Sequence, residues 1–197
     1  MKPAIGIDID EVTADFIGPL IKYKNKTSGV NLKKKDYFSF NLEEVWGGTR
    51  EEAIKFVSDF YKTKEFDEIL PLEGAIPGII SLKDQFDLIF ITARHSEGAE
   101  KTKGWIEKHL GEIPCELIIS SEFDGREATK AEICIAKEIG IMLEDNSKNA
   151  LECAEAGVNT ILFDRPWNQG AKHDNMVRVY NWSEALQEVA RIQAGNH

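Results

Sequence analysis

The sequence predicts an α/β fold: a doubly wound, Rossmann-like parallel sheet with a small helical cap inserted after the first strand. Two observations support this prediction. Short apolar runs recur along the 197-residue chain with helical segments between them, which is typical of βαβ units and parallel sheets. The interval between the first two runs is far longer than a crossover requires.

Five apolar runs are predicted to form the strands. Each has five or six residues, which suits a strand that is buried on both faces. They are AIGID (4–8), DLIFIT (87–92), ELIIS (116–120), GIMLE (140–144) and NTILF (159–163).

Helical patterns separate the later runs, and each pattern ends at a glycine. They cover residues 96–111, 129–140 and 146–157, so that Gly111, Gly140 and Gly157 are expected to follow the last helical turns. Glycine is frequent at this position because it adopts the left-handed backbone conformation without strain.

The segment between Asp10 and Asp87 is predicted to hold the cap. Three stretches in it have helical character, ADFIGPLIKYKNKTSG, NLEEVWGG and TREEAIKFVSDFYKTKEF, and Thr49 with Glu52 forms a capping box at the start of the third. The stretch LPLEGAIPGIISLKDQ then leads back to the sheet. We therefore expect a helical cap domain at 14–70 and an α/β core domain at 1–13 and 71–197.

Composition excludes several kinds of partner. The net charge of −10 argues against a nucleic-acid polymer, which normally binds a basic surface. The three cysteines lack the spacing of a disulfide framework or a zinc site and are typical of a reducing compartment. Neither a secretory signal nor a membrane span is apparent, so we expect a cytoplasmic protein with no membrane partner. The sequence leaves a homodimer open.

Charged and hydroxyl side chains stand at the carboxyl ends of the predicted strands. In open α/β sheets, ligands bind just beyond these ends. The residues brought to this edge are Asp8, Asp10, Thr92, Arg94, Lys130, Glu144 and Asp145.

This set of residues predicts a site for a metal ion and a phosphate. Clustered carboxylates raise one another's pKa and stay ionised together only beside a cation, and hard oxygen ligands suit Mg²⁺. Lys130, Thr92 and Arg94 are the types of residue that bind phosphate. A carboxylate can act as the nucleophile in phosphoryl transfer, with a second acid protonating the leaving oxygen.

The segments DIDEV, FITAR and LED, together with Lys130, resemble the four motifs of the haloacid dehalogenase-like (HAD) phosphohydrolases. The resemblance implies that Asp8 is the phosphorylated nucleophile and Asp10 the general acid/base, with the Asp10 carbonyl also touching Mg²⁺. It further implies that Thr92 and Lys130 bind the phosphoryl group. Asp145 would be the main metal ligand of the fourth motif, and Glu144 would reach the metal through water.

A narrower likeness covers most of the chain. DEVTADF, LPLEGA, KGWIEKHLG and FDRPWNQ are similar to segments of the 5'(3')-deoxyribonucleotidases, which release phosphate from nucleoside monophosphates. This likeness implies a base contact for Phe16, and the other candidates are Tyr37, Phe38 and Trp46. The substrate phosphate would meet the segment Thr92-Ala93-Arg94, where that family usually has Thr-Ser-Pro. Glu11 stands where the family usually has Gly, and we expect it to face solvent or the cap hinge.

These observations favour a Mg²⁺-dependent phosphomonoesterase that acts on a nucleoside or deoxynucleoside monophosphate through an aspartyl-phosphate. One alternative is a HAD phosphatase for a small non-nucleotide ester such as a sugar phosphate. A second is a receiver-like phospho-signalling module, which would carry its phosphorylated Asp after the third strand. Here the third predicted strand ends in Ser120 and Ser121.

Overall fold

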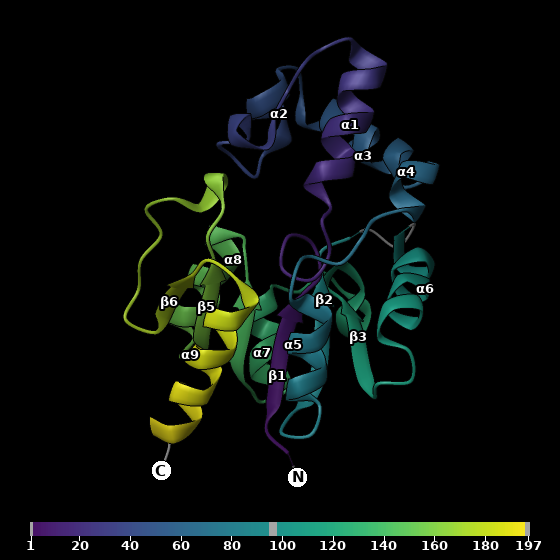
Figure 1. Cartoon of the computed structure of the whole chain (residues 1–197). Helices are drawn as coiled ribbons and strands as arrows, with labels where there is room; N and C mark the ends of the chain where they lie inside the picture. Colours follow the sequence, from purple (N-terminus) through teal and green to yellow (C-terminus); the bar gives the residue numbers. More distant parts are fainter. Residues whose placement is uncertain (1, 95–97, 196–197) are drawn as a thin grey trace.

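The strands form one parallel sheet of six in this computed structural model, which describes residues 2–94 and 98–195 (Figure 1). Their order is β3-β2-β1-β4-β5-β6, so the chain changes direction of winding between β1 and β4, at the switch point where such sheets bind ligands. The predicted doubly wound fold is confirmed. The strands are β1 (Ala4–Asp8), β2 (Asp87–Thr92), β3 (Cys115–Ile119), β4 (Ile139–Glu144), β5 (Asn159–Phe163) and β6 (Met176–Val179).

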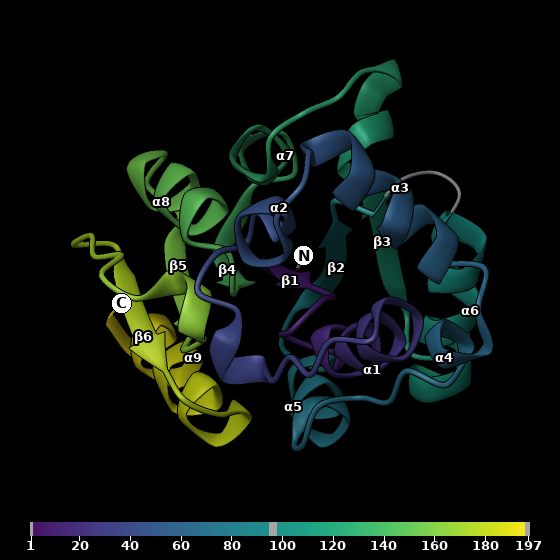
Figure 2. The ribbon, with the colours of Figure 1, turned by 90° about the horizontal axis from the view of Figure 1, so that it is seen from above.

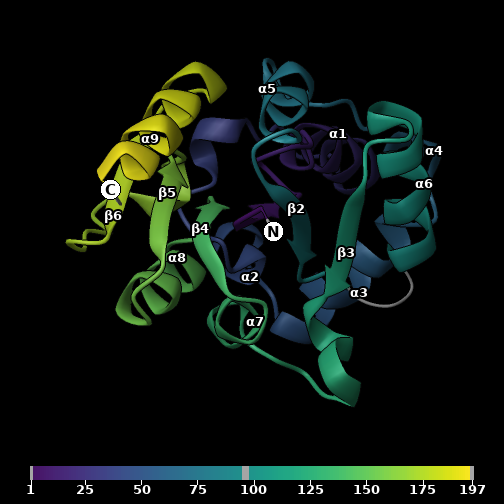
Figure 3. The same ribbon diagram turned by 90° about the horizontal axis from the view of Figure 1, so that it is seen from below.

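Helices cover both faces of the sheet (Figure 3). One face carries α5 (Ala75–Leu82), α6 (Ala99–Leu110) and α9 (Trp182–Gly195), and the other carries α7 (Lys130–Ala136) and α8 (Ser147–Glu155). Each face has its own apolar cluster, because the strands present side chains alternately to the two layers. Within the described ranges, no helix has the length and apolar character that crossing a membrane demands.

The last part of the sheet was not predicted. The sequence MVRV forms the short edge strand β6, and α9 follows it and packs on β5 and β6. A four-residue strand that is mostly half-buried gives no clear apolar run, which explains why the pattern missed it.

One predicted helix end is wrong. The helix expected to stop at Gly140 ends instead at Ala136, and Gly140 lies within β4. The left-handed position after this helix belongs to Glu138, with φ of 53°. Gly111 and Gly157 do adopt positive φ after α6 and α8, as predicted.

Four helices stand above the carboxyl ends of the strands (Figures 1 and 2). They are α1 (Ile17–Ser28), α2 (Leu42–Trp46), α3 (Arg50–Phe60) and α4 (Lys64–Asp67), and a 3₁₀ turn, η1 (Lys34–Asp36), lies between the first two. The predicted capping box is confirmed: Glu52 N donates to Thr49 Oγ1, and Thr49 N donates to the Glu52 carboxylate. The third predicted helix is broken, because Thr63 caps a new helix, α4. The domain boundaries near 14 and 70 stay a prediction.

Aromatic side chains fill the space between these upper helices. Phe16, Phe60 and Phe66 meet in edge-to-face contacts with ring centroids 5.6 to 6.5 Å apart. Trp46 Nε1 donates to the buried Tyr37 hydroxyl at 2.9 Å. Edge-to-face pairs add stabilisation beyond their buried area. A small helical layer thus obtains an apolar interior that is continuous with one face of the sheet.

Two glycine substitutions test the corrected helix end. A Cβ added at Gly140 or at Gly157 meets no neighbouring atom within 4 Å, but only Gly157 has positive φ, at 85°. Gly157→Ala should therefore lower the free energy of unfolding by about 1 kcal/mol. Gly140→Ala should leave it unchanged or raise it by up to about 1 kcal/mol, because alanine restricts the unfolded chain. Urea unfolding measures both, and equal losses would contradict the assignment of Gly140 to a strand.

Candidate active site

A tight loop at the end of β1 places the first two acids. Asp8 is the last residue of the strand and is buried. The loop reverses at once, because the backbone N–H groups of Thr13 and Ala14 both donate to Ile9 O and the Thr13 hydroxyl donates to Asp8 O at 2.8 Å. These bonds hold Asp8 and Asp10 at the carboxyl edge of the sheet.

Lys130 lies between two buried acids. It is the first residue of α7, which Thr129 and Glu132 start with a capping box. Lys130 Nζ lies 2.6 Å from Asp8 Oδ1 and 2.6 Å from Glu144 Oε2. Burial works against the charge of Lys130, but the two carboxylates outweigh it and raise the pKa of Lys130 above its usual value. Lys130 is therefore held as an ammonium.

The end of β4 and the loop after β5 fix the other two acids. Glu144 Oε1 accepts a hydrogen bond from Asn146 N at 2.9 Å, and Asn146 caps α8 with its own side chain. Asp145 Oδ2 accepts from Trp167 Nε1 at 2.7 Å. Asn168 Nδ2 donates to Asp145 O at 2.6 Å. Both carboxylates are thus held in fixed orientations.

Three of these acids form a cluster that fits a divalent cation. Asp8, Glu144 and Asp145 are buried, and each offers a carboxylate oxygen within 4.8 Å of the others. Burial, with the neighbouring carboxylates of Glu144 and Asp10, raises the pKa of Asp8 to about 7 against the effect of Lys130. Burial and the charges of Asp8 and Glu144 raise the pKa of Asp145 well above its usual range. Such a site favours a hard cation, which would compensate the repulsion.

Asp10 lies outside this cluster and is paired with Arg94. Arg94 Nε donates to Asp10 Oδ2 at 3.0 Å, and Nη2 donates to Asp10 Oδ1. Arg94 Nη1 donates to the Thr102 hydroxyl at 2.9 Å. The sequence predicted Arg94 as a phosphate ligand, and here its three nitrogens are engaged by protein groups.

A cavity of about 240 Å³ opens above these residues and below the upper helices. Among the predicted site residues, its wall includes Asp8, Asp10, Phe16, Ala93, Arg94, Lys130, Glu144 and Asp145. Thr92 is buried behind this wall, where its hydroxyl accepts from Arg94 N at 3.2 Å. Of the other candidate aromatics, Tyr37 lines the cavity, whereas Phe38 is exposed and Trp46 packs on Phe56.

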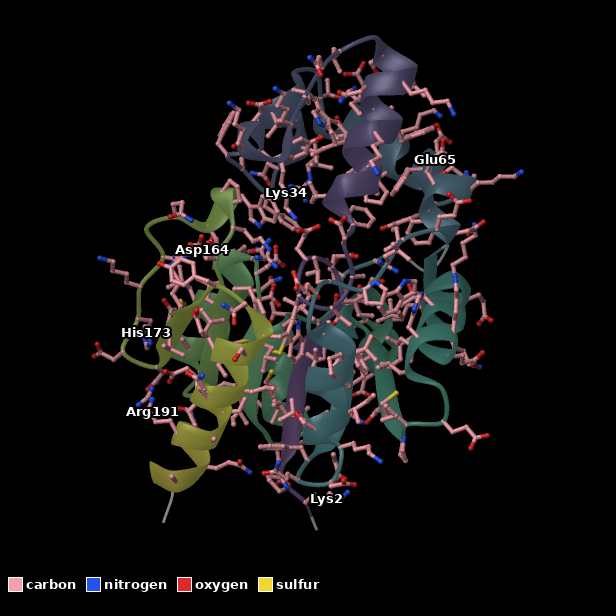
Figure 4. The ribbon with its side chains drawn as sticks, viewed as in Figure 1. Lys2, Lys34, Glu65, Asp164, His173 and Arg191 are labelled. Atoms are coloured by element: carbon pink, nitrogen blue, oxygen red, sulfur yellow. The ribbon has the colours of Figure 1, made fainter. Side chains whose placement is uncertain are left out.

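Glu11 does not face solvent, so that part of the expectation is wrong. It is 2% exposed, has φ of 60° and lies at the base of the upper helices. Its carboxylate accepts from Ile17 N at 2.8 Å and pairs with Lys34. Lys34 lies on the side of the upper helices that faces the sheet (Figure 4). The Glu11 carbonyl accepts from Arg165. Glu11 thus joins α1, η1 and the loop after β5.

Several residues that shape the site were not predicted as members of it. Trp167 and Asn168 hold Asp145, Thr13 locks the loop after β1, and Thr102 holds Arg94. The segment FDRPWNQ was recognised as family-like, but its spacing alone does not indicate that an indole N–H meets an acid twenty-two residues earlier. These contacts depend on tertiary structure.

Comparison with known proteins agrees with this geometry. The family model described as 5' nucleotidase, deoxy (pyrimidine), cytosolic type C protein (NT5C) matches residues 2–194. The chain belongs to this family. Membership confirms the predicted phosphomonoester hydrolase of the HAD superfamily.

A curated nucleotidase supports the NT5C assignment, and solved structures share the fold. The chain is 30% identical to the "Putative nucleotidase YqfW" of Bacillus subtilis (strain 168) over 93% of its own length and 91% of the relative. The HAD-like hydrolase SP0104 from Streptococcus pneumoniae shares the fold with a TM-score of 0.71 at 16% identity, covering 95% of this chain and 98% of that one. The "putative HAD-hydrolase YfnB" from Bacillus subtilis, bound to magnesium, shares the fold with a TM-score of 0.63 at 14% identity, covering 95% of this chain and 98% of that one.

Two lysine substitutions test how much the buried ion pairs of Lys130 contribute to the stability of the fold. Lys130→Met should lower the free energy of unfolding by about 3 to 5 kcal/mol, because it leaves two buried carboxylates without their cation. Lys137 is the matched control, since it lies 2.6 Å from Glu116 at a partly exposed site. Lys137→Met should cost less than about 1 kcal/mol. Urea unfolding in the presence of EDTA measures both. Similar losses of unfolding free energy in the two variants would show that the buried ion pairs of Lys130 contribute no more than an exposed pair.

Proposed function

We propose that this NT5C-family protein is a Mg²⁺-dependent phosphomonoesterase that hydrolyses a nucleoside or deoxynucleoside monophosphate through a phosphorylated Asp8. The position of Asp8 carries the proposal. Its carboxylate lines the cavity, lies next to the ammonium of Lys130, and belongs to the acidic cluster. Phosphoryl transfer depends mainly on such positioning and charge compensation.

The proposed reaction uses two carboxyl groups in sequence. A carboxylate oxygen of Asp8 attacks phosphorus while the bond from phosphorus to the ester oxygen breaks, and Asp10 gives its proton to that oxygen, which leaves as the alcohol. A water molecule then attacks phosphorus and gives a proton to Asp10. The bond between phosphorus and Asp8 breaks, and inorganic phosphate and the Asp8 carboxylate are formed. Lys130 would bind the phosphoryl oxygens. Thr92, the other ligand expected from the sequence, lies behind the cavity wall and would reach these oxygens only after the wall rearranges.

The acidic cluster is the proposed Mg²⁺ site. Asp8 and Asp145 would hold the ion, with Glu144 next to them and the Asp10 carbonyl as a further predicted ligand. Bound Mg²⁺ would compensate the negative charge of the phosphate next to these acids. Trp167 and Asn168 would keep Asp145 oriented toward the ion.

The upper wall of the cavity supports a nucleotide as the substrate. Phe16, Tyr37 and Leu42 give it apolar surface, and Asn41 and Arg50 add polar groups at the same wall. An aromatic and apolar wall with a few polar groups is suited to a nucleobase. The family description names a deoxynucleotide nucleotidase. The free cysteines agree with a cytoplasmic enzyme.

Replacement of the proposed nucleophile is the first test. Asp8→Asn keeps an oxygen acceptor for Lys130 but removes the carboxylate, so phosphate release from a deoxynucleoside monophosphate with Mg²⁺ should become undetectable. The thermal transition should remain cooperative. Asp84→Asn, at an exposed position, should retain the activity of the unmodified protein. Sustained turnover by the Asp8 variant would show that another residue is the nucleophile.

A pair of substrates tests the role of the base. A deoxynucleoside 5'-monophosphate and deoxyribose 5-phosphate have the same reacting group and differ in the base. If the upper wall binds the base, kcat/KM for the nucleotide should exceed that for the sugar phosphate by about 100-fold or more, as expected for remote binding energy used at the reacting centre. Release of inorganic phosphate measures both. Preference for the sugar phosphate would favour the non-nucleotide alternative.

Metal binding should depend on pH with a defined sign. Mg²⁺ binds ionised carboxylates, whereas burial raises the pKa of Asp8 to about 7, so at pH 6 the ion must displace protons. The increase in Tm on adding Mg²⁺ should therefore be larger at pH 8 than at pH 6. Asp145→Asn should reduce the increase at both values. Equal increases in the unmodified protein at pH 6 and pH 8 would contradict a proton-linked site.

A further inference from the structure

We propose that Arg94 is a positioning residue that holds the Asp10 carboxylate at the cavity wall for proton transfer, and that it does not bind the substrate phosphate. The inference rests on the proposed phosphomonoesterase reaction, in which Asp10 is the acid and base. It assigns a role to the arginine that stands in the second motif of this chain.

The contacts of Arg94 fix the plane of its guanidinium group. Nε and Nη2 donate side by side to the two oxygens of Asp10, which is the bidentate geometry that orients a carboxylate most strictly. Nη1 donates to the Thr102 hydroxyl, and that hydroxyl donates in turn to Gly98 O at 2.7 Å. The Arg94 side chain is 2% exposed, so water does not compete for these bonds.

Two aromatic rings also lie close to the guanidinium. Its central carbon lies 5.6 Å from the ring centroid of Phe16 and 5.1 Å from that of Phe66. These rings come from the two ends of the upper helical segment. Arg94 therefore cannot present a free fork to a phosphate unless it releases Asp10, and Lys130 remains as the cation beside Asp8.

Asp10 remains accessible although Arg94 is enclosed. Its side chain is 25% exposed and lines the cavity. Each carboxylate oxygen has two lone-pair sites, so the fork leaves one site on each oxygen for the transferred proton. Arg94 thus prevents the Asp10 side chain from rotating and leaves the cavity side of the Asp10 carboxylate open. Correct orientation of a general acid affects the step in which the ester oxygen leaves.

The choice of leaving group separates this role from phosphate binding. A nucleoside leaves as a poor leaving group that needs a proton, whereas p-nitrophenolate leaves without one. In Arg94→Lys, which keeps the charge and loses the fork, kcat should fall about 100-fold for a deoxynucleoside monophosphate and less than about 10-fold for p-nitrophenyl phosphate. Arg94→Met should show the same selectivity. In both variants, the inhibition constant of inorganic phosphate should stay within about twofold of its value in the unmodified protein.

The control is Arg191→Met, which removes an exposed ion pair with Glu188 on α9. This variant should leave kcat unchanged for both substrates. Equal losses for the two substrates, together with weaker inhibition by phosphate, would overturn the proposal and make Arg94 a phosphate ligand. Full activity of Arg94→Lys on the nucleotide would also overturn it, because one charge without the fork would then suffice.

A stability cycle tests the coupling without activity. The Tm of Asp10→Ala, Arg94→Met and the double variant should show that the double variant loses less than the sum of the single losses, since one interaction is counted in both. Additive losses would overturn the proposal. If the unmodified protein hydrolysed neither substrate, the proposed function would fail, while this cycle would still decide whether Arg94 holds Asp10.

Discussion

The buried ammonium of Lys130 is the interaction on which the carboxyl edge of the sheet depends. Three buried carboxylates, Asp8, Glu144 and Asp145, lie within 4.8 Å of one another, and Lys130 contacts two of them. Three carboxylates against one ammonium leave two negative charges when all are ionised. This excess of two negative charges matches in magnitude the charge of a divalent cation. Burial, and then the repulsion between neighbouring carboxylates, raises the pKa values of Asp8 and Asp145.

Each acid at the end of β1 is paired with a different cation. Asp8 meets Lys130 from α7, Asp10 meets Arg94 from the loop after β2, and Glu11 meets Lys34 from η1. The three partners come from a helix packed on the sheet, from the loop after β2 and from the turn between the upper helices. The short sequence DIDE is therefore the place where these three parts are joined, and its acids differ in role because their partners differ.

The strands and the acids at their ends could be predicted, because the ends of parallel strands meet at one edge and β1, β2 and β4 have clear apolar runs. The division of labour among the acids could not. Nothing in the spacing shows that Arg94 would turn to Asp10, or that one lysine of the basic stretch KNKTSGVNLKKK would turn inward to Glu11. Such pairings depend on how the upper helices sit on the sheet, which local pattern does not determine.

Glu11 shows how the upper helices are held against the sheet. A non-glycine residue at φ of 60° costs about 1 to 2 kcal/mol. Burial also raises the pKa of the Glu11 carboxyl group, so both the backbone conformation and the carboxylate charge of Glu11 are unfavourable on their own. Its bonds to Ile17 N and Lys34 offset that cost only while the upper helices lie against the sheet. Phe16 and Phe66 packed on Arg94 make a second attachment. Movement of these helices away from the cavity must therefore break both attachments or carry Asp10 and Glu11 along, which links access to the cavity with the geometry of the acid.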